Sequence, residues 1–233
     1  MVARRGPQGM SLQERVVNLI LERGLGPGDV VPPEPQLMAE LGASRNSVRE
    51  ALRALHTLGI VDIRHGHGTV VGHAPMTAML PALRFRAQQA VRHDADDLAE
   101  LVQVRRILEV ALIDEAARLT DDQFLADLEE AIAEMETGDL AETDRKFHLT
   151  LYQRVDNEIA TQLIDLFWTV YHQIDADLRP TTWKRSEIIA KHRLILHALR
   201  AGDPEAARAA MSAHFADIET RSRRLPRPIP ASA

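Results

Sequence analysis

The sequence predicts a mainly α-helical protein built from two parts. Of its 233 residues, 45% are hydrophobic and 4% are aromatic, and a chain rich in alanine and leucine favours helices over β-sandwiches. Apolar residues recur at helical spacing along most of the chain, and strand-like runs are confined to residues 60–71. We therefore expect an N-terminal winged helix-turn-helix followed by a C-terminal all-α helical bundle.

Composition excludes several kinds of site and location. The chain contains no cysteine, so any metal site must be built from histidine and carboxylate side chains. No apolar run approaches the ~18 residues that a membrane span needs, and no signal-peptide pattern opens the chain. We expect a cytoplasmic protein with no membrane partner.

The charge of the chain is distributed unevenly. The formal net charge is −6, but residues 1–75 hold 8 arginines against 7 acidic residues, while residues 76–233 hold 20 basic residues against 27 acidic ones. Four of the 8 arginines lie between Arg45 and Arg64. A near-neutral domain whose arginines cluster can still bind DNA, whereas the acidic remainder is a poor surface for it.

The N-terminal domain is expected over residues 11–73, after a disordered segment at residues 1–10. A first helix begins after Ser11, whose side chain can cap it together with Glu14, and glycines from Gly24 onward end it. Two prolines lead into a second helix, Glu34–Leu41, and Gly42 stops it. The short step to Arg45 is the turn of a helix-turn-helix.

The third helix, Arg45–Leu58, has two different sides. Its apolar residues recur at helical spacing, namely Val48, Leu52, Leu55 and Leu58. Polar residues gather on another side, namely Arg45, Asn46, Arg49 and Arg53. Arginine and asparagine carry the paired donors and acceptors that match guanine and adenine edges in the major groove. Ser44 is the expected N-cap.

A β-hairpin wing should follow the third helix. The apolar runs Ile60–Ile63 and Thr69–Val71 are joined by a His-Gly-His-Gly sequence at residues 65–68. The glycines permit a tight turn whose backbone can approach a phosphate closely. Helix, turn, helix and wing together favour DNA reading over an ordinary amphipathic surface helix.

Residues 11–72 resemble the winged-helix domain of GntR-family transcription regulators. The matching pieces are Pro-Gly-x3-Pro-x-Glu at residues 27–34, the Ser-Arg-x2-Val-Arg-Glu-Ala-Leu core from Ser44, and the Gly-x-Gly-Thr wing. The resemblance implies operator contacts from Ser44, Arg45, Asn46, Ser47 and Arg49, and entry into the minor groove by the wing tip His65, Gly66 and His67. The family usually has an arginine after the Pro-x-Glu, where this chain has Pro35, so one expected DNA contact is missing.

The second domain is expected over residues 76–224, where it binds an effector and forms a dimer. A linker ends at Pro75, and a disordered tail covers residues 225–233. The expected helices of this second domain are Met76–Ala90 (broken around Pro81), Asp96–Leu119, Asp121–Glu136, Leu140–Val155, Glu158–Leu178, Ser186–Leu199 and Pro204–Arg223.

Ionisable residues interrupt the apolar rows of three of these helices. Asp144 and His148 stand four residues apart in one row, and His192 and His214 replace apolar residues in two others. A single such histidine is more often a hydrogen-bonded core residue than a ligand. Together, three imidazoles and a carboxylate form a set suited to a divalent ion, zinc first, with nickel or manganese as alternatives.

Arg105 interrupts a fourth row, and two interpretations are open. It can form an internal ion pair with Glu109 or Asp144, or it can clamp an acidic small molecule that also binds the metal. Residues 95–220 resemble the helical ligand-binding domain of the FadR branch of GntR regulators, through Arg105-x3-Glu109, Asp144-x2-Phe147-His148, Asn157, His192 and His214. The resemblance implies metal binding by Asp144, His148, His192 and His214, and an effector site that includes Arg105 and Asn157.

A DNA reader joined to a pocket predicts a ligand-responsive transcription regulator that is not an enzyme, with repression the favoured sense of control. We expect a homodimer on a two-fold double-stranded operator, controlled by a small organic acid. The alternative is a metal-dependent hydrolase-like domain tethered to a DNA-binding head, because a metal-bound water becomes acidic. The sequence shows no general base beside the four ligands and no nucleophile motif, which favours the regulator.

Overall fold

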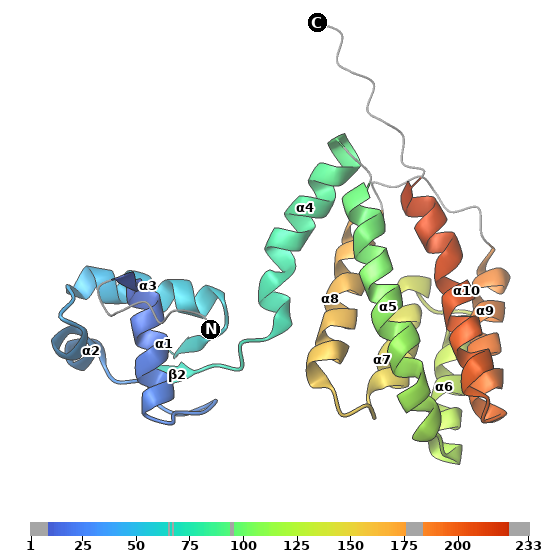
Figure 1. Ribbon diagram of the computed structural model, residues 1–233, viewed down its shortest axis with the longest axis horizontal. Coiled ribbons are helices and arrows are strands. Elements are labelled where there is room, and N and C mark those ends of the chain that lie inside the picture. Colours follow the sequence, from blue (N-terminus) through green and yellow to red (C-terminus); the bar gives the residue numbers. More distant parts are fainter. Residues whose placement is uncertain (1–8, 65, 67, 94–95, 176–183, 224–233) are drawn as a thin grey trace, which may run out of the picture. The chain divides into compact units, whose positions relative to one another are not determined.

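The computed structural model of the chain describes residues 9–64, 66, 68–93, 96–175 and 184–223. These residues form two compact units that divide after residue 78 (Figure 1). The mainly helical fold with an N-terminal winged helix-turn-helix and a C-terminal helical bundle is confirmed. Among the described residues, no helix is long and apolar enough to cross a membrane.

The N-terminal unit consists of three helices and one hairpin. The helices are α1 (Leu12–Glu22), α2 (Glu34–Leu41) and α3 (Arg45–Thr57). Strands β1 (Val61–Arg64) and β2 (Gly68–Val71) pair antiparallel. All three helices contact one another.

Local signals in the sequence explain where these helices begin and end. Ser11 and Glu14 form the expected capping box at α1, in which each side chain accepts from the other residue's backbone N–H. Gly42 ends α2 in the left-handed conformation, with φ 58°, which costs glycine little. The Ser44 hydroxyl caps α3 by accepting from the backbone N–H of Ser47.

The core of this unit lies between the helices and the hairpin. Its buried residues are Val16, Leu19, Ile20, Val31, Leu37, Leu41, Val48, Leu52, Leu55, Val61 and Val71. The expectation that Leu58 joins the apolar row of α3 is wrong. The helix ends at Thr57, Leu58 becomes its C-cap, and its side chain is 49% exposed.

The C-terminal unit follows a 3-10 helix, Met76–Met79, which accounts for the break expected around Pro81. Its helices are α4 (Leu80–His93), α5 (Asp96–Arg118), α6 (Asp122–Glu134), α7 (Leu140–Tyr152), α8 (Glu158–Asp175), α9 (Arg185–Arg200) and α10 (Pro204–Arg223). Helix α5 contacts α4, α7, α8 and α10. The polar residues on these neighbouring helices can therefore meet around α5.

Some expectations fall outside the described residues. They are the disorder of residues 1–8 and of the tail 225–233, the wing-tip residues His65 and His67, and the end of the helix at Leu178.

Candidate functional sites

Helix α3 exposes the polar side predicted from the sequence. Arg45, Asn46, Ser47 and Arg49 are exposed, while Val48 is fully buried beneath them. The hydroxyls of Ser44 and Ser47 lie 2.9 Å apart at the start of the helix. Five of the eight residues proposed to contact DNA thus lie together at the accessible N-terminal end of α3.

Arg49 is held in place by the preceding helix. Its Nε donates to both carboxylate oxygens of Glu34, at 2.8 and 3.0 Å. This bond to Glu34 raises the pKa of Arg49 above its usual value. Glu34 therefore orients Arg49, next to the position where Pro35 replaces the expected arginine.

The wing turn depends on glycine. Gly66 and Gly68 adopt φ angles of 77° and 84°, a region that other residues rarely occupy. The backbone of Gly66 is exposed at the tip. His65 and His67 lie outside the described residues, so their proposed DNA contacts stay predictions.

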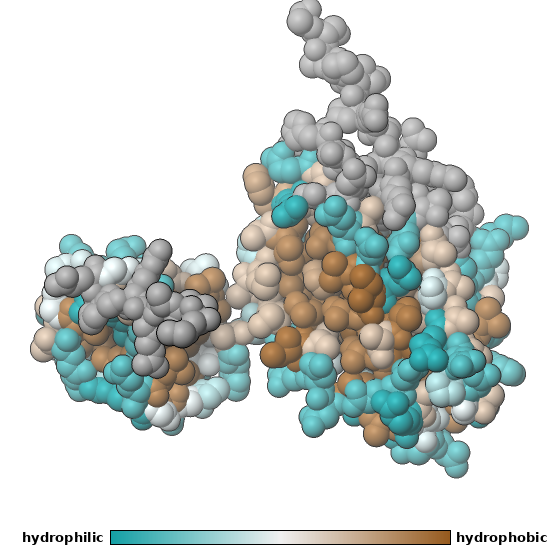
Figure 2. Space-filling model, in the orientation of Figure 1, coloured by the Kyte–Doolittle hydropathy of each residue, from teal (hydrophilic) through white to brown (hydrophobic). Residues whose placement is uncertain are grey.

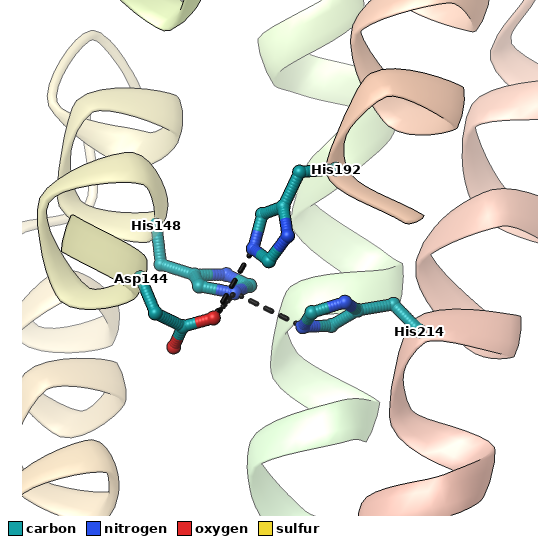
Figure 3. Close-up of side chains that lie close together, drawn as sticks. All are labelled: Asp144, His148, His192 and His214. Carbon is teal, nitrogen blue, oxygen red and sulfur yellow. Dashed lines mark hydrogen bonds and ion pairs between the residues drawn. The ribbon is translucent and has the colours of Figure 1, made fainter. Parts of the chain in front are cut away.

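The structure brings Asp144, His148, His192 and His214 together inside the C-terminal unit. Each offers one ligand atom, and these atoms all lie within 4.8 Å of one another (Figure 3). Nε2 of His148 lies 3.2 Å from Nε2 of His214, and Oδ1 of Asp144 lies 3.1 Å from Nε2 of His192. All three imidazoles are at most 5% exposed. Helices α7, α9 and α10 carry the four side chains.

Outer hydrogen bonds orient two of the imidazoles. His148 Nδ1 donates to Glu109 at 2.5 Å, and His192 Nδ1 donates to the carbonyl of Ile188 at 2.9 Å. In both rings Nδ1 carries a proton, so Nε2, which faces the centre of the cluster, can give its lone pair to a metal ion once it releases any proton of its own. This is the arrangement that a metal-binding histidine needs.

Two buried nitrogen atoms test whether the cluster fits a metal ion. Nδ1 of His214 has no hydrogen-bond partner among the described residues, and Nε2 of His192 makes only an ion-pair contact with Oδ1 of Asp144 at 3.1 Å, without the geometry of a hydrogen bond. Buried polar atoms without partners are costly, and a cation at the centre of the cluster would satisfy Nε2 of His192. Three imidazoles and one carboxylate form a possible metal site of the kind predicted, without indicating which metal.

The charge states of the cluster also suit a cation. Burial would raise the pKa of Asp144, but attraction to the imidazoles of His148 and His192 outweighs it and places the pKa well below its usual value. Burial and the two neighbouring imidazoles hold the pKa of His214 well below its usual value. The carboxylate is thus ionised and His214 is neutral at neutral pH, as metal ligands must be.

Arg105 and Glu109 lie beside the cluster on α5. Arg105 is 4% exposed, and its Nε donates to Glu109 at 2.6 Å. The same carboxylate accepts from His148, and these attractions lower the pKa of Glu109 against the raising effect of burial. The internal pair considered for Arg105 therefore forms, but its buried Nη2 has no partner among the described residues.

A cavity of about 660 Å³ opens beside the four residues. Arg105, Asp144 and His214 line it together with Leu140, Ile188 and Ile218. Tyr171, His172 and Arg185 also line it and were not predicted from the sequence. The cavity thus places a buried arginine, two proposed metal ligands and apolar walls around one space.

Asn157 is placed elsewhere. It is exposed, and its Oδ1 accepts from the backbone N–H of Ala160 at 3.0 Å, which makes it the cap of α8. It does not line the cavity. The geometry therefore supports a structural role and gives no support to the proposed effector contact.

Trp168 is a site residue that the sequence did not reveal. Its indole N–H donates to Oδ2 of Asp144 at 2.9 Å. The two residues are 24 positions apart on α7 and α8, so no local spacing connects them. Only the packing of the two helices creates the contact.

Comparisons with known proteins agree with this arrangement. Residues 10–71 match the family described as bacterial regulatory proteins, gntR family, and residues 100–217 match the FCD domain. A curated relative, the HTH-type transcriptional regulator LutR of Bacillus subtilis, is 29% identical over 84% of this chain and 92% of its own length. The putative L-lactate dehydrogenase operon regulatory protein of Escherichia coli is 28% identical over 91% of this chain and 85% of its own length.

A solved structure carries the same fold. The GntR protein of Streptococcus agalactiae superposes with a TM-score of 0.64 and 27% identity, covering 90% of this chain and 97% of that protein. The similarity spans both units of the chain.

Proposed function

The chain belongs to the GntR family of bacterial regulatory proteins and carries an FCD domain, and on this basis we propose that it is a metal-dependent, acid-responsive repressor. It is a DNA-binding transcription regulator and not an enzyme, as its relatives are regulators. The hydrolase alternative is therefore set aside. The metal, the acid, the dimer and the sense of control belong to the proposal.

The observation that carries the proposal is the lining of the cavity. Arg105, Asp144 and His214 line the same space, and the buried Nη2 of Arg105 has no hydrogen-bond partner in the part of the chain that the structure describes. A buried guanidinium with unused donors suits a carboxylate. One small acid can therefore contact Arg105 with one oxygen and the metal with another.

Zinc is the preferred ion, with nickel or manganese as alternatives. Asp144, His148, His192 and His214 would hold it through one oxygen and three nitrogens, a set that suits zinc. When bound, the ion supplies a positive charge that attracts the carboxylate or hydroxyl oxygens of the acid. Glu109 then keeps His148 oriented and holds Arg105 beside the acid.

A small hydroxycarboxylate is the effector class that we favour. A hydroxyl and a carboxylate on adjacent carbons can both bind one cation, while the second carboxylate oxygen reaches an arginine. One relative carries L-lactate in its name, as the putative regulator of an L-lactate dehydrogenase operon. L-Lactate is therefore the first probe for this chain.

Repression would depend on two reading heads held in a homodimer. The C-terminal unit exposes Phe85, Val104 and Ile107 on α4 and α5, each more than 40% exposed, and Figure 2 shows hydrophobic residues gathered around α5. Apolar surface of this kind favours association. A two-fold dimer would read a two-fold operator, and the acid would act by binding one arrangement of the heads more tightly.

The DNA assignment is tested with the full chain and a fragment of its own promoter. Arg49→Ala is expected to weaken binding about tenfold or more, because a good arginine contact to a base contributes about 1–3 kcal/mol. Arg200→Ala removes an exposed arginine that pairs with Glu129 in the C-terminal unit and is the control. Equal retention of the fragment by wild type and Arg49→Ala would contradict the assignment.

The metal and acid assignments use two further measurements. His148→Ala together with His192→Ala is expected to abolish bound zinc in elemental analysis, and undiminished zinc would remove the site. With zinc-loaded wild type, L-lactate is expected to release the promoter fragment, while Arg105→Gln should remain bound at the same concentration. Release of both proteins alike would contradict the role of Arg105.

A further inference from the structure

The Asp144 carboxylate uses its two oxygens for different purposes. Oδ1 lies 3.1 Å from Nε2 of His192 and 3.8 Å from Nε2 of His148, and Figure 3 shows one oxygen of Asp144 directed at the imidazoles and the other turned away. Oδ2 accepts from the indole N–H of Trp168 at 2.9 Å. The carboxylate is therefore held with only one oxygen toward the proposed ion.

The donor that holds Oδ2 is difficult to displace. Trp168 is 5% exposed, and its ring stacks on His172 with centroids 3.7 Å apart and planes 16° apart. The Arg145 guanidinium lies 5.8 Å from the ring centroid and is itself fixed by two hydrogen bonds to Asp165. An indole nitrogen can donate a hydrogen bond but cannot accept one. Trp168 is therefore always the donor to Asp144, and its nitrogen cannot itself become a metal ligand.

Divalent ions differ in how they use a carboxylate. Zinc is satisfied by four nitrogen or oxygen ligands at short distance, whereas calcium and manganese prefer more oxygen ligands, and calcium often takes both oxygens of one carboxylate. Turning Asp144 to offer both oxygens would break its bond to Trp168 and leave a buried N–H without a partner. That cost falls on oxygen-preferring ions and not on zinc.

We propose that Trp168 restricts Asp144 to one-oxygen ligation and thereby determines the preference of the centre for zinc or nickel over manganese and calcium. Trp168 is a positioning residue, since it acts on the metal through Asp144. The inference rests on the proposed metal centre and adds a determinant of its selectivity.

Trp168→Phe in the full chain tests the inference. Phenylalanine keeps an aromatic ring against His172 and removes the N–H. Zinc and manganese affinities of the metal-free protein are measured by competition with a chelating dye. Outer-shell substitutions typically reduce metal affinity about 10- to 100-fold. Because the cost imposed by the indole bond falls on manganese, we expect Trp168→Phe to bind manganese more tightly and zinc no more tightly than wild type, so that the ratio of zinc to manganese affinity falls at least about tenfold.

The matched control is Arg145→Gln, which removes the guanidinium over the Trp168 ring and leaves the indole bond to Asp144 in place. It is expected to keep the wild-type affinity ratio. Equal weakening of both ions by Trp168→Phe would indicate general loss of structure and would overturn the selectivity role. A wild-type chain that binds neither ion would overturn the metal centre itself, and the inference with it.

A measurement on the wild-type protein does not depend on folding of a variant. The indole N–H signals of ¹⁵N-labelled protein are followed by NMR during hydrogen–deuterium exchange, and Trp168 is assigned with the variant Trp183→Phe. The Trp168 proton is expected to exchange slowly in both metal-free and zinc-loaded protein. Fast exchange in the zinc-loaded protein would show that Asp144 has left the bond and would overturn the proposal.

Discussion

Replacing Glu109 by glutamine removes the negative charge that accepts hydrogen bonds from both Arg105 and His148. Glu109 is fully buried and accepts from Arg105 Nε at 2.6 Å and from His148 Nδ1 at 2.5 Å. Glutamine has nearly the same shape but only one acceptor oxygen, and its NH2 group would face one of the two donors. Arg105 would then be a buried cation without a countercharge.

The expected loss of stability is large. Breaking a buried ion pair by removing one partner typically costs about 3–5 kcal/mol. The same substitution at Glu129, whose pair with Arg200 is 51% and 63% exposed, is expected to cost at most about 1 kcal/mol. Glu129→Gln is therefore the matched control for Glu109→Gln.

Tryptophan fluorescence reports on the C-terminal unit, which contains Glu109. Both tryptophans of the chain, Trp168 and Trp183, lie in the C-terminal part, so urea unfolding monitored by fluorescence in the presence of a chelator reports that part alone. Adding Arg105→Met to Glu109→Gln should recover much of the loss, since no unpaired charge remains. A loss below about 1 kcal/mol, or a double variant less stable than the single one, would refute the reasoning.

Three further predictions concern pH, packing and DNA. The pKa of His214 is held well below its usual value, so the unfolded chain binds a proton that the folded chain does not. Metal-free protein should therefore lose up to about 1.4 kcal/mol per pH unit below about pH 6.5, and urea midpoints at pH 7.5 and 5.5 that coincide would contradict this. A Cβ added at Gly72 would lie 2.2 Å from the carbonyl oxygen of Gly59, so Gly72→Ala should destabilise the N-terminal unit by more than about 1 kcal/mol, measured by circular dichroism. If the N-terminal unit of Gly72→Ala unfolds at the same point as that of the wild-type protein, the close approach of Gly72 to Gly59 would be contradicted. Glu34→Gln removes the acceptor charge that orients Arg49 and should weaken promoter binding up to about tenfold, or about 1.4 kcal/mol, in a retention assay; unchanged affinity would show that Arg49 does not need this partner.

Short-range features were predictable because they depend on a few neighbouring residues. The capping pair Ser11 and Glu14, the left-handed Gly42 and the N-cap Ser44 all stand where the sequence placed them. Each satisfies backbone groups within about one helical turn. Leu58 shows the limit of this reasoning, since its periodic position predicted burial but the helix stops before it.

The candidate metal site was predictable in part. Asp144 and His148 share a helical face by spacing alone, and the interruption of apolar rows pointed to His192 and His214. That these histidines meet depends on how α7, α9 and α10 pack, which spacing within single helices cannot specify. The resemblance to a known family supplied the connection.

Other features could not be read from the sequence at all. Asn157 resembles a site residue of the FadR branch, yet here it caps α8. Trp168 is 24 positions from Asp144, and the apolar rows of a helix predict burial without saying which polar atom a buried indole meets. Glu109 was visible as a partner for Arg105, but its second bond to His148 joins α5 to α7.

The sequence by itself determined the helices, the two units, the exposed polar side of α3 and the residue types available for a metal site. These follow from hydrophobic periodicity, capping and the absence of cysteine, which act locally or through composition. Only the tertiary structure decided which ligand atoms converge, which oxygen of Asp144 faces them, and that Arg105, whose Nη2 has no hydrogen-bond partner among the described residues, lines the neighbouring cavity. Hydrogen bonds and ligand bonds are directional and short-ranged, so they depend on the packing angles of helices that are distant in the sequence.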